Sequence, residues 1–385
     1  MELEKIKNEA QISSFLFKKA TSARIPLGGT FELSPVCNFS CKMCYVRKTQ
    51  KEVSESSRPI MTCEQWLNLA EELREEGMLY LLLTGGEPFL WQDFWELYTK
   101  LHEMGFLISI NTNGSLINEK AIERLKKYPP TRINLTLYGA SDETYEALCG
   151  IKGVFHKVDK AIRGLKEAKI AVKLNCSLTP ENAGDLEKIV SYAKEQELLL
   201  DVATYMFPPL RRDTSMVGQN ERFTPEESAF YNLERYRLQY GEEMYIQYLE
   251  RLSAGLIPPP GLEESCIDPV DGKIMCRAAK SSFWITWDGS MTPCGMMYEP
   301  KIDITTQKFK EGWKQLVKIG EELVCSGICT TCSNHKICHA CAAVAQAETG
   351  KVSGIPVYLC EQMTAARNLA EKELSLRKNK EGTET

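Results

Sequence analysis

Six short apolar or β-branched runs alternate with amphipathic stretches through the first half of the chain, and this alternation limits the possible folds more than any other feature. We place the runs at 30–36, 79–84, 107–111, 132–138, 171–178 and 200–206. Strands that alternate with helices are typical of βα units arranged around a parallel sheet. The sequence therefore predicts six parallel strands, with helices filling the gaps between them.

Two of the intervening helices carry clear signals. The first has Thr62 as its N-cap, Gln65 at the capping-box position and Gly77 just past its end. The second has an apolar stripe at spacings of three and four residues, formed by Phe155, Val158, Ile162 and Leu165. Such a stripe seats a helix against a sheet, so we interpret it as core.

The pattern changes after residue 206. A tyrosine-rich helical stretch covers 224–252, and a Pro-Pro-Pro-Gly break at 258–261 indicates a domain boundary. The expected segments are an N-terminal segment (1–29), an α/β barrel (30–210), a helical linker (211–260), a cysteine-rich domain (261–365) and a charged tail (366–385) that frays from 371 onward.

Composition narrows the function. The formal charge is -5, and no basic stripe suggests a nucleic-acid partner. We find no signal peptide and no run of the roughly 20 apolar residues that a bilayer requires, so we expect a cytoplasmic protein without a membrane partner. The chain has 15 cysteines. Because the cytosol keeps thiols reduced, metal binding explains so many cysteines better than disulfides do.

Three cysteines follow the first predicted strand. Cys37, Cys41 and Cys44 lie in the sequence CNFSCKMCY. Three thiolates can hold three irons of a [4Fe-4S] cluster and leave the fourth iron open for another ligand. A zinc knuckle or incidental buried thiols are the alternatives, but barrel sites lie at the carboxyl ends of strands, where this motif falls.

The spacing of this motif, with an aromatic residue after the third cysteine, resembles the signature of the radical S-adenosylmethionine (SAM) superfamily. The resemblance implies a partial (β/α)6 TIM-like barrel. It also implies that the open iron chelates SAM, whose reductive cleavage releases a 5'-deoxyadenosyl radical. Met43, inside the motif, becomes a candidate cofactor contact.

A second motif supports the first. Gly85-Gly86-Glu87-Pro88 follows the second predicted strand and resembles the superfamily motif that meets the SAM amino group with backbone carbonyls and a glutamate. Later strands offer weaker candidates for SAM binding, each of which is equally a satisfied polar group at a strand end: Asn113, Thr136 and Asn175.

The chain departs from the superfamily pattern after the fourth strand. Where related sequences often read Ser-Leu-Asp-Gly, this chain has Thr136-Leu137-Tyr138-Gly139, and the expected SAM-pairing arginine is replaced by Cys149. Lys173 or backbone groups are candidates to meet the SAM carboxylate instead.

The C-terminal cysteines resemble the SPASM domain, an extension of radical SAM enzymes that modify peptides and proteins. Gly289 lies between Cys276 and Cys294, and the tail pattern follows at Cys329, Cys332, Cys338, Cys341 and Cys360. The gap between Cys338 and Cys341 holds two residues, one fewer than usual. The resemblance implies two auxiliary [4Fe-4S] clusters. One would use Cys276, Cys294 and Cys341 with Cys266; the other would use Cys329, Cys332, Cys338 and Cys360.

Alternatives to this ligand assignment remain. Cys325 is as plausible a fourth ligand as Cys266, and without either the first auxiliary cluster has an open iron. Zinc is a second alternative, because His335 and His339 lie among paired cysteines. Cys63 and Cys176 fall in a helix and a strand, where we interpret them as buried thiols.

The resemblance implies oxidative modification of a peptide or protein side chain, such as a thioether or carbon-carbon crosslink. An external donor of the flavodoxin or ferredoxin type would supply electrons. Sulfatase maturation ranks lower, since Gly295 replaces the aspartate of those enzymes. The 36 residues before Cys37 are too few for the leader-binding winged helix that peptide maturases often carry. The sequence does not indicate which residue acts as a catalytic base.

Other functions and other roles stay open. A radical SAM enzyme that acts on a small molecule and a non-catalytic electron-transfer or iron-storage protein are alternatives to a peptide-modifying enzyme. Arg211 and Arg212, after the sixth strand, are either a grip for a substrate carboxylate or solvated surface charge.

Overall fold

A computed structural model describes residues 2–256 and 267–381. The break at 258–261 and Cys266 lie outside these residues. The helices are α1 Glu2–Ala23, α2 Gln50–Ser54, α3 Cys63–Glu75, α4 Phe94–Glu103, α5 Glu119–Lys127, α6 Asp142–Cys149, α7 Phe155–Glu167, α8 Leu186–Glu195, α9 Pro225–Tyr240, α10 Glu242–Ser253, α11 Phe309–Glu322, α12 Gly327–Thr330, α13 Ala342–Thr349 and α14 Val357–Glu381, with 3-10 turns η1 Pro88–Leu90, η2 Ala183–Asp185 and η3 His335–Ile337.

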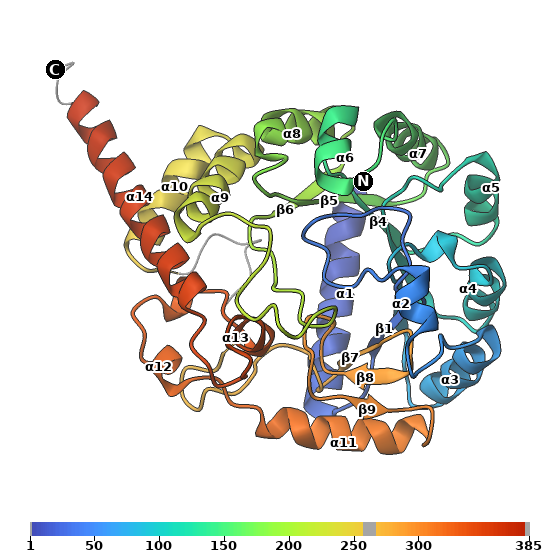
Figure 1. The fold of residues 1–385 in the computed structure, drawn as a ribbon. Helices are drawn as coiled ribbons and strands as arrows, with labels where there is room; N and C mark the ends of the chain where they lie inside the picture. The colour runs from blue at the N-terminus through green and yellow to red at the C-terminus, as the bar shows by residue number, and fades with distance from the viewer. Residues whose placement is uncertain (1, 257–266, 382–385) are drawn as a thin grey trace.

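The strands form one curved sheet. They are β1 Gly28–Glu32, β2 Tyr80–Thr84, β3 Leu107–Thr112, β4 Arg132–Thr136, β5 Val172–Ser177, β6 Leu199–Ala203, β7 Ser282–Ile285, β8 Ser290–Thr292 and β9 Ile302–Asp303. Their order is β6-β5-β4-β3-β2-β1-β7-β8-β9, and β1 to β6 run parallel in chain order. Helices α3, α4, α5, α7 and α8 line the outside of the curve (Figure 1). This arrangement confirms the predicted partial (β/α)6 barrel.

The caps of α3 and the apolar stripe of α7 are present as the sequence predicts. Thr62 accepts the backbone N–H of Gln65 at 3.2 Å, and the Gln65 side chain accepts the Thr62 N–H at 2.8 Å. Gly77 has a φ of +91° just past the end of α3. The predicted stripe of α7 faces the sheet, with Val158, Ile162 and Leu165 buried.

The C-terminal region joins the same sheet, which sequence reasoning did not predict. Strand β7 pairs in parallel with β1, and β8 and β9 follow it in antiparallel pairs. Gly29 permits this contact because a Cβ there would lie 2.5 Å from the Phe283 ring. The cysteine-rich region is therefore anchored to the strand that leads into the first cysteine motif.

The linker forms two helices that pack against a third. Gly241, with a φ of +84°, separates α9 from α10, and both helices contact α14. The rings of Tyr236 and Tyr248 stack at 4.3 Å within this bundle, so these tyrosines contribute to its packing. Helix α14 continues to Glu381, so residues 371–381, which we expected to fray, are helical. Across the described ranges, no helix has the length and apolar character needed to cross a bilayer.

Candidate iron–sulfur and SAM site

The first three cysteines lie in one loop at the carboxyl end of β1. The end of α6 holds this loop in place: the Ser40 N–H donates to the Cys149 carbonyl at 2.8 Å, and the Lys42 N–H donates to the Leu148 carbonyl at 3.1 Å. Within the loop, the Cys44 N–H donates to the Cys41 carbonyl at 3.1 Å. The backbone that carries the three thiols is therefore fixed by the barrel.

The sulfur environment fits a set of cluster ligands. The Phe39 N–H donates to Cys37 Sγ at 3.3 Å, and the Arg47 N–H donates to Cys44 Sγ at 3.3 Å. Burial raises the pKa of Cys37 to about 12 and also raises the pKa of Cys44. Buried thiols with N–H groups directed at sulfur would be stabilised as thiolates by the positive charge of iron.

The residue types also fit an iron–sulfur cluster. Three cysteine thiolates can hold three irons of a [4Fe-4S] cluster and leave the fourth iron open. Among residues 2–256 and 267–381, no three His, Cys, Asp or Glu side chains surround a point where one metal ion could bind.

Tyr138 and Cys149, at which the chain departs from the superfamily pattern, both influence the sulfur of Cys41. Hydrogen bonds from Cys149 and then from Tyr138 lower the pKa of Cys41 against the opposing effect of burial. Cys149 is fully buried, and the Tyr138 ring lies 6.2 Å from Phe39 of the cysteine loop. Tyr138 and Cys149 therefore line the loop around Cys41, a role that sequence reasoning missed.

The two glycines after β2 let two strand ends approach closely. A Cβ on Gly85 would lie 2.4 Å from the Ser34 carbonyl, and one on Gly86 would lie 2.4 Å from the Val36 carbonyl. The Gly86 N–H donates to Ser34 at 2.7 Å. This stretch, which ends at Pro88 in η1, thus lies directly beside the segment that enters the cysteine loop.

The carboxylate of Glu87 faces the end of β3. It accepts hydrogen bonds from Thr112 Oγ1 at 2.8 Å and from the Asn113 N–H at 2.9 Å, and the side chain is fully buried. Burial raises the pKa of Glu87 to about 7 despite these donors. Glu87 therefore positions Asn113. Because its carboxylate is already hydrogen-bonded, the backbone carbonyls of residues 85–88 are the groups of this motif that suit the amine of a ligand.

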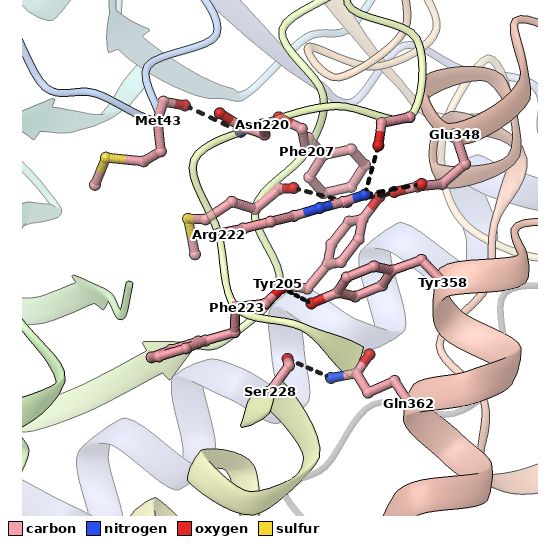
Figure 2. A network of polar contacts seen from close by, with 12 residues as sticks. Met43, Tyr205, Phe207, Asn220, Arg222, Phe223, Ser228, Glu348, Tyr358 and Gln362 are labelled. Carbon is pink, nitrogen blue, oxygen red and sulfur yellow. Dashed lines mark hydrogen bonds and ion pairs between the residues drawn. The ribbon is translucent and has the colours of Figure 1, made fainter. Parts of the chain in front are cut away.

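The remaining SAM candidates lie along the same edge of the sheet. Asn113 Nδ2 donates to Asn38 Oδ1 at 3.0 Å and lies 3.8 Å from Cys37 Sγ. Thr136 and Asn175 are direct neighbours in the β4–β5 register. Met43 is buried, and its carbonyl accepts Asn220 Nδ2 at 3.4 Å (Figure 2).

Four of the C-terminal cysteines lie near one another. Burial raises the pKa of Cys329, and the nearby Cys360 and Cys332 raise it further. Burial raises the pKa of Cys338 to about 11, with contributions from the same three cysteines. Backbone N–H groups again face sulfur, at 3.4 Å for both Cys332 and Cys338. The structure thus brings together the four cysteines predicted for the second auxiliary cluster.

The other auxiliary set is described in part. Burial raises the pKa of Cys294, to which Cys276 adds, and the Met296 N–H donates to Cys294 Sγ at 3.5 Å. Cys276, Cys294 and Cys341 border the same apolar cluster. Cys325, whose pKa burial raises to about 11, is influenced by both Cys329 and Cys276, and so lies between the two sets.

A buried ion pair connects the two cysteine regions. Arg211 donates to both oxygens of Glu32 at 2.7 Å and to the Gly295 carbonyl at 2.8 Å. Its guanidinium lies 5.8 Å from the Tyr45 ring, and Trp284 Nε1 donates to Glu32 at 3.0 Å. Arg211 is thus occupied by Glu32. No sequence signal linked these two residues.

A second buried ion pair holds the loop after β6 to the C-terminal helices. Arg222 Nη1 lies 2.5 Å from Glu348 Oε1, and both side chains are more than 90% buried. The guanidinium contacts the rings of Tyr205 and Tyr358, whose centroids lie 5.5 Å and 4.0 Å away (Figure 2). Since Tyr358 is two residues from Cys360, this network positions the second cysteine set.

Comparisons with known proteins agree with this architecture. Residues 31–193 match the radical SAM superfamily. The AdoMet-dependent heme synthase of Methanosarcina barkeri is 24% identical over 83% of this chain and 92% of its own length.

Two solved structures share the fold. SuiB of Streptococcus suis bound to its precursor peptide SuiA is 20% identical, has a TM-score of 0.63 and covers 94% of this chain and 81% of its own. AnSMEcpe with bound AdoMet and the Cp18Cys peptide is 18% identical, has a TM-score of 0.65 and covers 92% of this chain and 99% of its own.

Proposed function

We propose, from the premise that this chain carries a radical SAM domain, that it reductively cleaves SAM and uses the product to modify a peptide or protein side chain oxidatively. A thioether or a carbon-carbon crosslink is the expected type of product. The observation that carries this proposal is the loop of Cys37, Cys41 and Cys44, fixed at the carboxyl edge of the sheet beside Gly85 and Gly86.

Different residues would bind the cluster and SAM. Cys37, Cys41 and Cys44 would hold a [4Fe-4S] cluster, which when bound supplies the electron that splits SAM into methionine and a 5'-deoxyadenosyl radical. The carbonyls of residues 85–88 suit the SAM amino group. Thr136 and Asn175, on neighbouring strands, are the proposed polar contacts further along the edge.

The C-terminal cysteines would hold two auxiliary [4Fe-4S] clusters. The grouping of Cys329, Cys332, Cys338 and Cys360 supports one of them, and the contribution of Cys276 to the raised pKa of Cys294 supports the other. These clusters would accept the electron that an oxidative modification releases. A flavodoxin or ferredoxin would supply the electron for SAM cleavage.

A peptide substrate agrees with the structures that share the fold, since SuiB and anSMEcpe were each solved with a peptide. Sulfatase maturation is disfavoured by packing around Gly295. A Cβ at this position would lie 2.5 Å from the Trp284 ring, so the site has no room for the aspartate that such enzymes carry there.

The test is an anaerobic incubation of the reconstituted enzyme with SAM, reductant and short peptides encoded beside its gene. We expect 5'-deoxyadenosine together with a peptide that has lost about two hydrogens by mass. Deoxyadenosine without a mass change in any peptide would contradict peptide modification. Absence of deoxyadenosine would contradict the radical SAM proposal and favour a non-catalytic iron–sulfur protein.

A small-molecule substrate is the second candidate, and one observation favours it. The heme synthase of Methanosarcina barkeri matches nearly its full length, so the likeness includes the C-terminal region. If no peptide is modified while a tetrapyrrole changes mass in the same assay, this candidate replaces the first.

A further inference from the structure

A buried arginine lies between the two cysteine regions and contacts both. Arg211 Nη1 donates to the carbonyl of Gly295, the residue after Cys294, at 2.8 Å. The Arg211 guanidinium also lies 5.8 Å from the ring of Tyr45, the residue after Cys44. Only 9% of the Arg211 side chain is exposed. A cation shielded from water therefore lies between residues that flank cysteines of two different sets.

The neighbouring arginine contacts the first cysteine loop directly. Arg212 Nη1 donates to the Cys44 carbonyl at 3.3 Å. The segment after β6 thus donates one hydrogen bond to the loop of the first cysteine set and another to the turn after Cys294. Arg212 is exposed to solvent, whereas Arg211 is not. Because water screens an exposed charge, Arg211 is the arginine whose charge acts strongly on its surroundings.

Glu32 supplies the opposite charge at the same place. Both of its carboxylate oxygens accept from Arg211 at 2.7 Å, and one also accepts from Trp284 Nε1 at 3.0 Å. Only 1% of the Glu32 side chain is exposed. Trp284 also packs on Gly295, where a Cβ would lie 2.5 Å from its ring. Strands β1 and β7 therefore fix this ion pair beside the turn that carries Cys294.

The two charges act on the nearby side chains in opposite directions. Burial raises the pKa of Cys294, and Arg211 opposes that rise. Burial also raises the pKa of Tyr45, which Arg211 lowers and Glu32 raises. Cys44 and Cys294 both contribute to the raised pKa of Tyr45, so one ring lies within electrostatic range of a cysteine from each set.

We propose that Arg211 is a positioning residue for the first auxiliary cluster, and that the charge balance between Arg211 and Glu32 sets the reduction potential of that cluster. The inference rests on the proposed function, in which Cys276 and Cys294 help to hold the cluster. In the proposed reaction a substrate radical loses one electron and the cluster gains it. This transfer makes and breaks no bond, and it leaves the cluster more negative by one charge. Arg211 favours that change, and Glu32 opposes it.

A purely structural role for the pair is the alternative. In that case, loss of either partner would weaken the turn after Cys294 without a consistent effect on the potential. An electrostatic role predicts something different, because loss of the cation and loss of the anion must shift the potential in opposite directions. The sign of the shift therefore separates the two roles.

The experiment is a redox titration of the reconstituted anaerobic enzyme, followed by electron paramagnetic resonance. The signal of the first auxiliary cluster is the one that disappears in Cys294→Ala. Arg211→Gln removes the cation, Glu32→Gln removes the anion, and the double variant removes both. Arg24→Gln is the matched control, because it breaks the pair of Arg24 with Glu321 near the amino end of β1, away from the cysteine regions.

The two single variants should shift the potential by similar amounts and with opposite signs. At a fixed potential, the ratio of reduced to oxidised cluster should fall about tenfold in Arg211→Gln and rise about tenfold in Glu32→Gln. A tenfold change corresponds to about 59 mV for a one-electron couple. The double variant should return close to the wild-type potential, and Arg24→Gln should keep it.

The inference is overturned by shifts of the same sign, by an unchanged potential in either single variant, or by an equal shift in Arg24→Gln. If Arg211→Gln loses the cluster, Glu32→Gln decides: a raised potential supports the inference, and any other result overturns it. Loss of the cluster from both single variants would establish the structural role instead.

Failure of the proposed function gives a different result. Absence of any signal that depends on Cys294 would overturn the proposed ligand set, and this inference with it. Failure of the wild-type enzyme to form deoxyadenosine with dithionite would overturn SAM cleavage. The titration needs no SAM, so it would still decide the role of Arg211 and Glu32.

Discussion

The two cysteine regions of this protein are assembled in opposite ways. In the barrel, Cys37, Cys41 and Cys44 lie within eight consecutive residues, and backbone hydrogen bonds to α6 fix their loop. In the C-terminal region, the cysteines proposed as ligands span 276–360 and come near one another only after distant segments pack together. The first site is thus encoded locally, whereas the second depends on tertiary contacts. A substitution far from the cysteines should therefore disrupt the second site more easily than the first.

Removal of the first cysteine set should have the largest effect of any change. We expect a triple Cys37→Ala, Cys41→Ala, Cys44→Ala variant to lose about four irons per chain and to keep those bound by the C-terminal cysteines. Iron analysis and electron paramagnetic resonance of the anaerobic protein check this. Cys63→Ala, which removes a thiol from α3, is the control and should keep all the iron. Loss of all iron from the triple variant would show that the two regions are not independent.

The second site should be sensitive to a residue far from its sulfurs. Arg222→Met leaves Glu348 buried without its cation, and removal of one partner from such a pair costs about 3–5 kcal/mol. We expect a fall in the free energy of unfolding of this size, with iron lost first from the C-terminal cysteines. Lys314→Met breaks an exposed pair and should cost at most about 1 kcal/mol. Equal stability of the two variants would refute the role of this network.

The midpoint potential of the first cluster should change when a hydrogen bond to one of its cysteines is removed. Tyr138→Phe removes a donor to Cys41, and such donors stabilise the more negative, reduced cluster. We expect the midpoint potential of the first cluster to fall by on the order of 50 mV. Tyr192→Phe, which removes a hydroxyl bonded to Asp159 on the outer helices, should leave the potential unchanged. A potential that does not move in Tyr138→Phe would exclude a tuning role.

The smallest effect concerns pH. Burial raises the pKa of Glu87 to about 7, so the folded protein binds more protons than the unfolded chain between about 4.5 and 7. Stability should therefore decrease as the pH rises through this window. In Glu87→Gln the unfolding midpoint should vary less with pH than in the wild type, because that group no longer titrates. Parallel pH profiles of the two proteins would contradict the raised pKa.

Sequence reasoning reached the local features and missed the distant ones. The six strands, the capping box at Thr62 and the cysteine loop depend on neighbouring residues, so periodicity and spacing could predict them. The pairing of Arg211 with Glu32 joins residues 179 positions apart, and no local pattern encodes it. The same holds for the parallel pairing of β7 with β1.

The measurement that tests the account most directly is deoxyadenosine formation from SAM by the dithionite-reduced enzyme. The wild type should produce it. The triple variant of Cys37, Cys41 and Cys44 should produce none, even while it retains the iron of its C-terminal cysteines. Deoxyadenosine formed by the triple variant at the wild-type rate would contradict the assignment of SAM cleavage to this loop.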